Sequence, residues 1–304
     1  MKAARDAYGE ALKELAKKER VVVLDADLSG STKTSEFKKV CPERFFNMGI
    51  AEQNMMGTAA GLAASGKIPF ASTFAVFATG RAYEIIRNSI CYPNLNVKVV
   101  ATHAGLTVGE DGASHQMLED ISLMRGLPNM TVISPADYNE TITAIKAVAE
   151  MEGPVYVRLG RSKVPVVTDG KFEIGKATTL KEGNDITIAA TGVMVSRALG
   201  AHDILKEKGI SARVINFSTI KPIDTGAIIK AAKETRGIIT AEEHNIIGGL
   251  GSAVAEVLSE NYPTRLKRIG VKDSFGRSGD GFELLDYYGL GVKDIVEAAM
   301  EWGN

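Results

Sequence analysis

Cysteine is scarce in this sequence of 304 residues, which has only two, Cys41 and Cys91. They lie far apart and match no metal-ligand spacing, as is typical of a protein in a reducing cytoplasm. A dominant charge is also lacking, because 36 basic and 37 acidic residues leave a net charge of −1. This balance argues against a nucleic acid or an anionic membrane surface as a partner.

Long hydrophobic runs are absent as well. No apolar stretch reaches the roughly 18 residues that a transmembrane helix needs, and residues 1–6 open a charged helix rather than a signal peptide. We therefore expect a soluble protein of the cytoplasm. With 45% hydrophobic and 24% charged residues, the chain has an ordinary globular composition and the length of about two domains.

Short β-branched runs alternate with longer segments of helical periodicity, such as residues 138–150 and 196–208. Nearly all-apolar strands that alternate with helices are typical of parallel sheets covered on both faces. The fold class is therefore predicted to be α/β, with parallel or mixed sheets in three-layer domains. The predicted strands are residues 21–25, 97–101, 131–134, 186–190, 212–216 and 237–241.

A polar, turn-rich stretch at residues 165–184 separates the two halves and contains two acid–glycine pairs, Asp169-Gly170 and Glu182-Gly183. Such clusters mark loops between periodic segments. We predict a first domain at residues 1–165, a linker at 166–182 and a second domain at 183–304.

Glu52 stands where a polar loop turns into a small-residue helix over residues 51–65. Gly57, Ala60, Gly61 and Ala64 follow helical spacing and form a smooth face that lets another backbone approach closely. A carboxyl group in such a water-poor place must be paired or have its pKa raised. Alternatively, Glu52 is a helix-start glutamate that the macrodipole favours.

The segment of residues 102–116 follows a predicted strand and holds three glycines, two histidines and two acids. In open α/β sheets, ligands bind at the carboxyl ends of the strands, where this loop falls. His103 and His115 could donate to an oxygen-rich substrate or act as acid–base groups. A zinc site is not expected without a third ligand nearby. The alternative is an irregular loop with solvated histidines.

Two further features have both a structural and a functional interpretation. Phe74 and Phe77 lie three apart on a strand-to-helix turn, so they either belong to the core or sandwich a flat ring. Arg161 ends a buried-type strand, where its planar fork could hold a phosphate or carboxylate, or simply be a surface charge.

Seven short motifs follow one another along essentially the whole chain. They are Gly49-Ile-Ala-Glu-Gln53, Ser72-Thr-Phe-x-x-Phe77, Ala101-Thr-His103, Gly109-Glu-Asp-Gly-x-x-His-Gln116, Pro154-Val-Tyr-Val-Arg-Leu-Gly-Arg161, Asn216-Phe-Ser-Thr-Ile-Lys-Pro-Ile-Asp224 and Glu242-Glu-His-Asn-x-x-Gly-Gly-Leu-Gly-Ser252. Taken together and in this order, the motifs resemble the C-terminal half of transketolase. The resemblance implies a pyrimidine-binding domain of the thiamine diphosphate fold followed by a transketolase C-terminal domain.

The resemblance implies thiamine diphosphate as cofactor, whose thiazolium carbon carries a two-carbon glycolaldehyde unit from a ketose to an aldose. Glu52 would bond the N1′ nitrogen of the aminopyrimidine and favour the tautomer that deprotonates the thiazolium. Phe74 and Phe77 would stack on the ring, although a third family aromatic falls at Gly80 here. Asp27 matches an acid near the cofactor at the subunit interface.

For the substrate, the resemblance assigns His103 and Asp111 to the sugar hydroxyls and the transferred unit, with His103 also counted as catalytic. It assigns the sugar phosphate to His115, Arg161, Arg5 and Ser31.

Gly279-Asp-Gly281 resembles the opening of the family's diphosphate-and-metal motif, but the expected asparagine pair about thirty residues later is missing. We therefore expect a split enzyme in which a separate N-terminal subunit binds the diphosphate and Mg²⁺ (or Ca²⁺), with no metal ligand from this chain. A heterotetramer is expected, with copies of this chain associating through the pyrimidine-binding domain and its small-residue face.

Three alternatives remain. 1-Deoxyxylulose-5-phosphate synthase has a similar loop, which typically begins Asp-Arg where this chain has Thr102-His103. The β subunit of a 2-oxo acid dehydrogenase shares Gly-Ile-Ala-Glu-Gln but lacks Gly-Glu-Asp-Gly. A non-catalytic homologue would have no reason to retain Glu52, His103, Asp111, His115 and Arg161 together.

Overall fold

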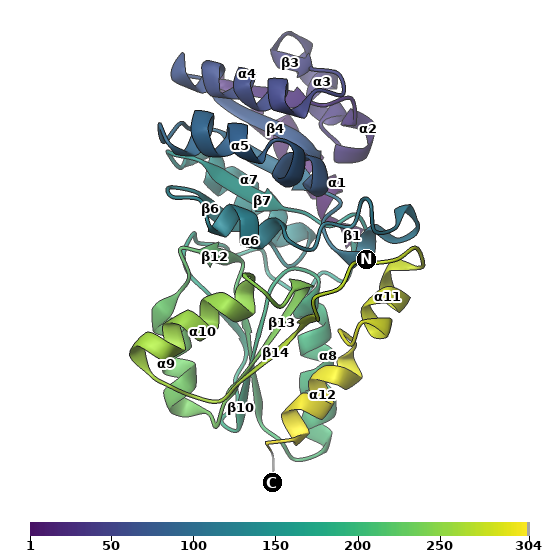
Figure 1. The fold of residues 1–304 in the computed structure, drawn as a ribbon, viewed down its shortest axis with the longest axis vertical. Helices are drawn as coiled ribbons and strands as arrows, with labels where there is room; N and C mark the ends of the chain where they lie inside the picture. Colours follow the sequence, from purple (N-terminus) through teal and green to yellow (C-terminus); the bar gives the residue numbers. More distant parts are fainter. Residues whose placement is uncertain (303–304) are drawn as a thin grey trace.

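The computed structural model describes residues 1–302, which form two large sheets, one above the other in Figure 1, and a two-stranded ribbon. The upper sheet has seven strands in the order β12-β6-β7-β5-β4-β2-β3. Its six strands from the first half of the chain run parallel, and β12 pairs antiparallel with β6 at the edge. The strands are β2 (Val21–Asp25), β3 (Phe45–Asn47), β4 (Ile68–Phe74), β5 (Lys98–Thr102), β6 (Thr131–Ile133), β7 (Val155–Arg158) and β12 (Thr219–Lys221).

Helices cover both faces of this sheet, which explains why its strands are apolar on both sides. Side chains alternate along a strand, so Val22 and Leu24 join one core cluster and Val21 and Val23 join the other. The α-helices of this half are α1 (Ala4–Leu15), α2 (Ser29–Thr32), α3 (Ser35–Val40), α4 (Glu52–Ala64), α5 (Tyr83–Ile85), α6 (Asp120–Arg125) and α7 (Tyr138–Glu150).

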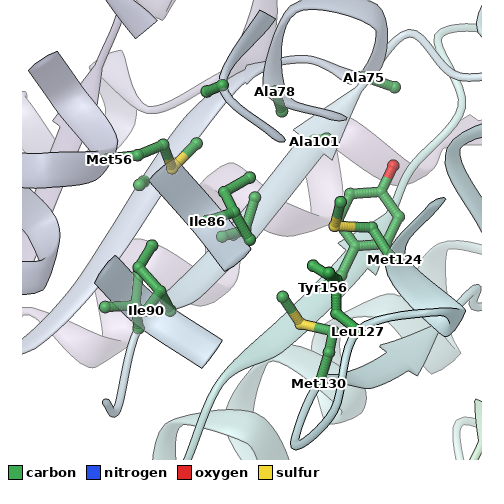
Figure 2. Close-up of a cluster of buried hydrophobic side chains, with 14 of the residues drawn as sticks. Met56, Ala75, Ala78, Ile86, Ile90, Ala101, Met124, Leu127, Met130 and Tyr156 are labelled. Atoms are coloured by element: carbon green, nitrogen blue, oxygen red, sulfur yellow. The ribbon is translucent and has the colours of Figure 1, made fainter. Parts of the chain in front are cut away.

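The first cluster packs α4, α6 and the segment between β4 and β5 against the sheet, whereas the second packs α1, α3 and α7 against its other face. Figure 2 shows the first cluster. The side chains of Met56 in α4, Ile86 in the segment between β4 and β5, and Met124 in α6 point toward one another above the sheet. The segment after β4 includes two π-helical stretches, Phe77–Arg81 and Ile86–Cys91.

The lower sheet has five strands in the order β14-β13-β10-β11-β9, of which only β9 runs antiparallel. In Figure 1, α9 and α10 lie on one side of it and α8 and α12 on the other. The elements are β9 (Thr178–Lys181), β10 (Ile186–Ala190), β11 (Ala212–Asn216), β13 (Ile238–Asn245), β14 (Leu266–Val271), α8 (Met194–Glu207), α9 (Thr225–Glu234), α10 (Leu250–Asn261), α11 (Gly281–Tyr287) and α12 (Val292–Met300).

The predicted fold class is confirmed, because both halves are three-layer α/β units. The predicted strands are all present, but the edge strands β9, β12 and β14 were not predicted from the sequence. β9 lies within the predicted linker, where its polar residues sit at an exposed sheet edge. β12 comes from the second half of the chain and pairs with the first sheet, so the two units share an edge. The exact domain boundary stays a prediction.

Within residues 1–302, no helix is both long enough and apolar enough to cross a bilayer.

Candidate active site

The carboxyl edge of the first sheet gathers almost every predicted site residue. Strand order reverses between β2 and β4, and such switch points are where ligands bind in open α/β sheets. Arg5 alone follows none of the strands of this sheet and lies in the first turn of α1. The others follow β2 (Asp27, Ser31), β3 (Glu52), β4 (Phe74, Phe77), β5 (His103, Asp111, His115) and β7 (Arg161).

Glu52 is the first residue of α4 and is only 1% exposed. Its Oε2 accepts a hydrogen bond from Nη1 of Arg81 at 2.8 Å, so the prediction of a buried, paired carboxylate is confirmed. The turn before the helix is fixed by Asn47, whose Oδ1 accepts from the backbone N–H groups of Asp27 and Gly49. Gly49 has φ +69°, a conformation that favours glycine.

Asp27 belongs to the same turn. Its φ of 63° is left-handed, and its Oδ1 accepts from the Asn47 Nδ2 at 2.9 Å. The structure therefore brings Asp27 to the entrance of the helix that carries Glu52.

The two phenylalanines are stacked on each other, with ring centroids 6.0 Å apart and 13° between their planes. Phe74 also stacks on His103 at 3.7 Å, and the edge of His115 meets Phe77 at 5.6 Å. Phe74 is buried, whereas Phe77 is half-buried. The predicted aromatic pair and the predicted histidine pair thus form one cluster.

His103 is buried and uncharged. Its Nδ1 lies 2.8 Å from the Thr102 hydroxyl, and its φ of 58° is left-handed. Burial, reinforced by the positive charges of Arg5 and Arg161, lowers the pKa of His103 to about 3. At neutral pH the imidazole is therefore a hydrogen-bonding group rather than a cation.

The cationic side chains of Arg5 and Arg161 also lie near His103. The short strand β1 (Lys2–Ala3) pairs antiparallel with β8 (Lys163–Val164), which brings the start of α1 beside Arg161. Nη1 of Arg5 donates to the Ser31 carbonyl at 3.1 Å, so Arg5 and Ser31 are in contact as well. Partial burial, and to a smaller degree the charge of Arg161, lower the pKa of Arg5 against the opposing effect of Asp6.

Arg161 is itself held by the histidine loop. Its Nη1 donates to the Val108 carbonyl and to Oε2 of Glu110 at 3.0 Å. Glu110 is exposed, so this ion pair is weak and the guanidinium can exchange it for another anion.

The second domain supports this loop. Oε1 of Glu243 on β13 accepts from the Thr107 backbone N–H at 2.5 Å. The amide of Gln116 donates to carbonyls of its own loop and to that of Arg277 at 2.9 Å. Gly105 has φ +83°, and a Cβ there would lie only 2.2 Å from the Glu243 carboxyl carbon. The C-terminal domain is therefore part of the structure that shapes the site.

Asp111 takes part in no side-chain hydrogen bond or ion pair within residues 1–302. It is exposed at the end of a 3₁₀ segment, Leu106–Asp111. In Gly279-Asp-Gly281, Asp280 caps α11 and accepts from the backbone N–H groups of Phe282 and Glu283. No group of three or more His, Cys, Asp or Glu side chains in the described part of the chain is arranged to hold a metal ion.

Arg81 is the site residue that the sequence did not reveal. It contacts Glu52, and its guanidinium carbon lies 4.6 Å from the Phe77 ring centroid. The only sequence signal is its position four residues after Phe77, directly after Gly80.

The fold and the site define a class of two-domain α/β proteins with a dry carboxylate, stacked aromatics and clustered cations at one sheet edge. Comparison with known proteins identifies the family. Residues 1–167 match the transketolase pyrimidine-binding domain, and residues 175–295 match the transketolase C-terminal domain. The chain therefore belongs to the transketolase family, and its predicted resemblance to the C-terminal half is confirmed.

Two curated relatives match over nearly their whole length. A protein of Methanocaldococcus jannaschii named as a transketolase C-terminal section is 58% identical, covering 99% of this chain and 96% of the relative. The 6-deoxy-6-sulfo-D-fructose transketolase subunit of a Clostridium species is 44% identical, covering 98% of this chain and 93% of the relative.

A solved structure described as a split-gene transketolase, inactive β4 tetramer, is also similar. It has 58% identity and a TM-score of 0.93, covering 99% of this chain and 98% of that chain. The family consists of transferases that depend on thiamine diphosphate, so membership supports a transferase-type enzyme.

Proposed function

We propose that this chain is the C-terminal subunit of a two-chain transketolase. With thiamine diphosphate and a separate N-terminal subunit, it transfers a two-carbon glycolaldehyde unit from a ketose phosphate to an aldose phosphate. The observation that carries the proposal is the buried Glu52 carboxylate beside stacked Phe74 and Phe77, next to a cluster of cationic side chains.

The residues of this chain fit the aminopyrimidine half of the cofactor. When bound, thiamine diphosphate supplies the nucleophilic carbon that carries the two-carbon unit. Glu52 would hold the proton at the N1′ ring nitrogen, since a charge-assisted bond is strong in a dry place. Phe74 and Phe77 would exclude water from the ring, and Asp27 would lie near the cofactor at the subunit boundary. The partner would bind the diphosphate and Mg²⁺ or Ca²⁺.

The remaining site residues fit a sugar phosphate. His103, being uncharged, can donate to or accept from sugar hydroxyls and the transferred unit, together with Asp111. The phosphate would lie among His115, Arg161, Arg5 and Ser31. Arg5 and Arg161 are close enough for the charge of Arg161 to lower the pKa of Arg5. Two cations that repel each other in this way are stabilised when an anion binds between them.

Two observations support a multi-subunit assembly. The similar split-gene structure is described as an inactive β4 tetramer, which indicates that this relative associates with itself and that this tetramer is inactive. On α4 of our chain, Gly57, Gly61 and Ala64 are exposed, and a Cβ at either glycine would meet no atom within 4 Å, whereas Ala60 is buried in the first core cluster. Most of the predicted small-residue face is therefore open. We propose that it packs against a second copy of this chain in a heterotetramer.

Reconstitution tests the proposal. The isolated chain is expected to bind thiamine diphosphate poorly and to have no transferase activity, because it supplies only the pyrimidine half of the site. Mixing it with the N-terminal subunit should restore both properties, as measured by calorimetry with Mg²⁺ and by transfer between xylulose 5-phosphate and ribose 5-phosphate. Tight Mg²⁺-dependent binding by this chain alone would contradict the two-chain proposal.

Phosphate recognition can be tested separately. Arg161→Gln or His115→Gln should raise the KM of a phosphorylated sugar about tenfold or more, because a charged hydrogen bond contributes about 1.5–3 kcal/mol. The KM of the corresponding unphosphorylated sugar should change little. Lys171→Gln, which removes an exposed charge far along the chain, serves as the control. Equal effects on both sugars would mean that Arg161 and His115 do not bind the phosphate.

A second substrate class has a specific motive. The Clostridium relative is named for a sulfosugar, and a sulfonate is a tetrahedral anion like a phosphate. Comparing a sugar phosphate with the corresponding sulfosugar in the same assay decides which anion the cationic cluster prefers. Release of CO₂ from pyruvate or another 2-oxo acid would instead favour the alternative enzymes, a deoxyxylulose-phosphate synthase or a dehydrogenase β subunit.

A further inference from the structure

Arg81 makes two contacts within the proposed pyrimidine site. Its Nη1 donates to the Glu52 carboxylate at 2.8 Å, and its guanidinium carbon lies 4.6 Å from the centre of the Phe77 ring. No other side chain in residues 1–302 donates a hydrogen bond to Glu52. The guanidinium is therefore both the partner of the buried carboxylate and the cover of the half-buried aromatic ring.

These are the contacts that an aminopyrimidine would make. A guanidinium is planar and delocalised, donates hydrogen bonds to carboxylates and stacks on aromatic faces. A protonated ring nitrogen over Phe77 would likewise bond the carboxylate and stack on the ring. Two groups with the same requirements cannot satisfy them at the same oxygen and the same ring face at once.

We propose that Arg81 is a placeholder for the aminopyrimidine: it pairs with Glu52 in the cofactor-free chain and must leave for the ring to enter. This inference rests on the proposed function and adds a residue that sets the affinity for the cofactor. When the competent state is only partly populated, the apparent affinity falls by that fraction. Arg81 therefore weakens cofactor binding while it stabilises the empty site.

The local structure suits such an exchange. Arg81 is the last residue of the π-helical stretch Phe77–Arg81, and π-helical turns are frequent at functional sites. Ala78 and Ala82 are fully buried and anchor the backbone on both sides. The Arg81 side chain is 47% exposed, so it can move into solvent without disturbing the core. Gly80, with no atom within 4 Å of a Cβ, leaves room beside it.

The empty chain needs such a partner. A fully buried carboxylate without one is costly, because it loses its hydration and gains no compensating bond. Arg81 provides that bond until the cofactor replaces it. Removing Arg81 should thus have opposite effects on the two states, destabilising the cofactor-free chain and strengthening ring binding.

The test uses the full isolated chain and the ring alone as probe, 4-amino-5-hydroxymethyl-2-methylpyrimidine, with affinity measured by ligand-observed NMR. Arg81→Ala is expected to bind the probe about tenfold more tightly than the unmodified chain. Arg81→Lys, which keeps the charge without the planar fork, should give an intermediate affinity. Arg87→Ala is the matched control, since Arg87 is exposed and its side chain donates only to Asn88; it should bind as the unmodified chain does.

The melting temperature of the cofactor-free chain is the second measurement. Arg81→Ala should lower it, and adding Glu52→Gln should restore most of the loss, because no unpaired charge then remains. Equal, Glu52-dependent probe binding by the unmodified chain and Arg81→Ala would overturn the placeholder role and leave the proposed function intact. Probe binding that ignores Glu52 would remove the ring site and the proposed function with it. No binding by any variant would overturn the placeholder role, because Arg81→Ala should gain affinity, and it would leave the two-chain proposal to the reconstitution test.

Discussion

Glu52→Gln is expected to abolish sugar transfer by the two-chain enzyme while leaving its fold and assembly intact. The carboxylate is 1% exposed, and glutamine has almost the same shape. The amide cannot hold the proton at the ring nitrogen as the carboxylate does, and proton transfer by a positioned group contributes typically about 10²–10⁴-fold in rate. We expect kcat to fall by at least about a hundredfold.

The fold should survive because Arg81, which loses its carboxylate partner, is not confined to a dry place. Arg81 is 47% exposed, so its guanidinium can be hydrated when Glu52 is replaced. Circular dichroism and gel filtration of the mixed enzyme should therefore be unchanged. Glu84→Gln is the matched control, since Glu84 is an exposed acid in α5 whose side chain accepts only from Asn88. Turnover of Glu52→Gln like that of this control would remove Glu52 from the catalytic role.

The position of Glu52 could be predicted because its signal is local. The polar loop and the small-residue helix on either side are both sequence neighbours, and they indicated a dry, paired carboxylate. The identity of the partner could not be predicted. Arg81 lies 29 positions away, and only the packing of α4 against the π-helical stretch brings the two side chains together.

The strands of the two sheets were predictable for a similar reason. Most central strands are runs rich in β-branched residues, because helices cover both of their faces. β9 and β12 are edge strands with polar or very short sequences, so they have no such run. β12 also pairs with a strand from the other half of the chain, which a local pattern cannot indicate.

The histidine loop was predictable from its local sequence, whereas the contact that supports it was not. Its glycines, acids and histidines predicted a site at the end of β5, and the structure stacks His103 on Phe74 there. The support for the loop comes from Glu243, which lies 136 positions from the Thr107 that it binds. In the sequence, Glu242-Glu-His-Asn was therefore a family motif without a physical role.

The contacts of Arg158 show that the Glu242-Glu-His-Asn motif joins the two domains. Substitution of Arg158 should have the largest effect on stability. Arg158 is 5% exposed, its Nε donates to Oδ2 of Asp120 at 2.8 Å and its Nη2 donates to the Glu243 carbonyl at 2.8 Å. The Tyr156 hydroxyl donates to the same Asp120 oxygen at 2.7 Å. Nη1 of Arg158 also lies 3.9 Å from Oε2 of Glu243. One buried cation therefore compensates two buried carboxylates from different domains, next to the loop that carries the histidines.

Arg158→Met is expected to destabilise the chain by about 3–5 kcal/mol, because it leaves buried charge without a partner. Urea unfolding followed by circular dichroism measures this loss. Arg20→Met is the control, since Arg20 is exposed and donates only to the Gly66 carbonyl; a surface change of this kind should stay within about 0.5 kcal/mol.

The loss should also depend on pH with a defined sign. Burial already raises the pKa of Glu243, and Arg158 opposes that rise. Without Arg158 the folded-state pKa moves further above the unfolded value, so the folded state takes up a proton that the unfolded state releases. Stability of Arg158→Met should therefore fall as pH rises from about 5 to 8, relative to the unmodified chain. A penalty that is independent of pH would mean that lost packing of the arginine stem, rather than unpaired carboxylates, causes the instability.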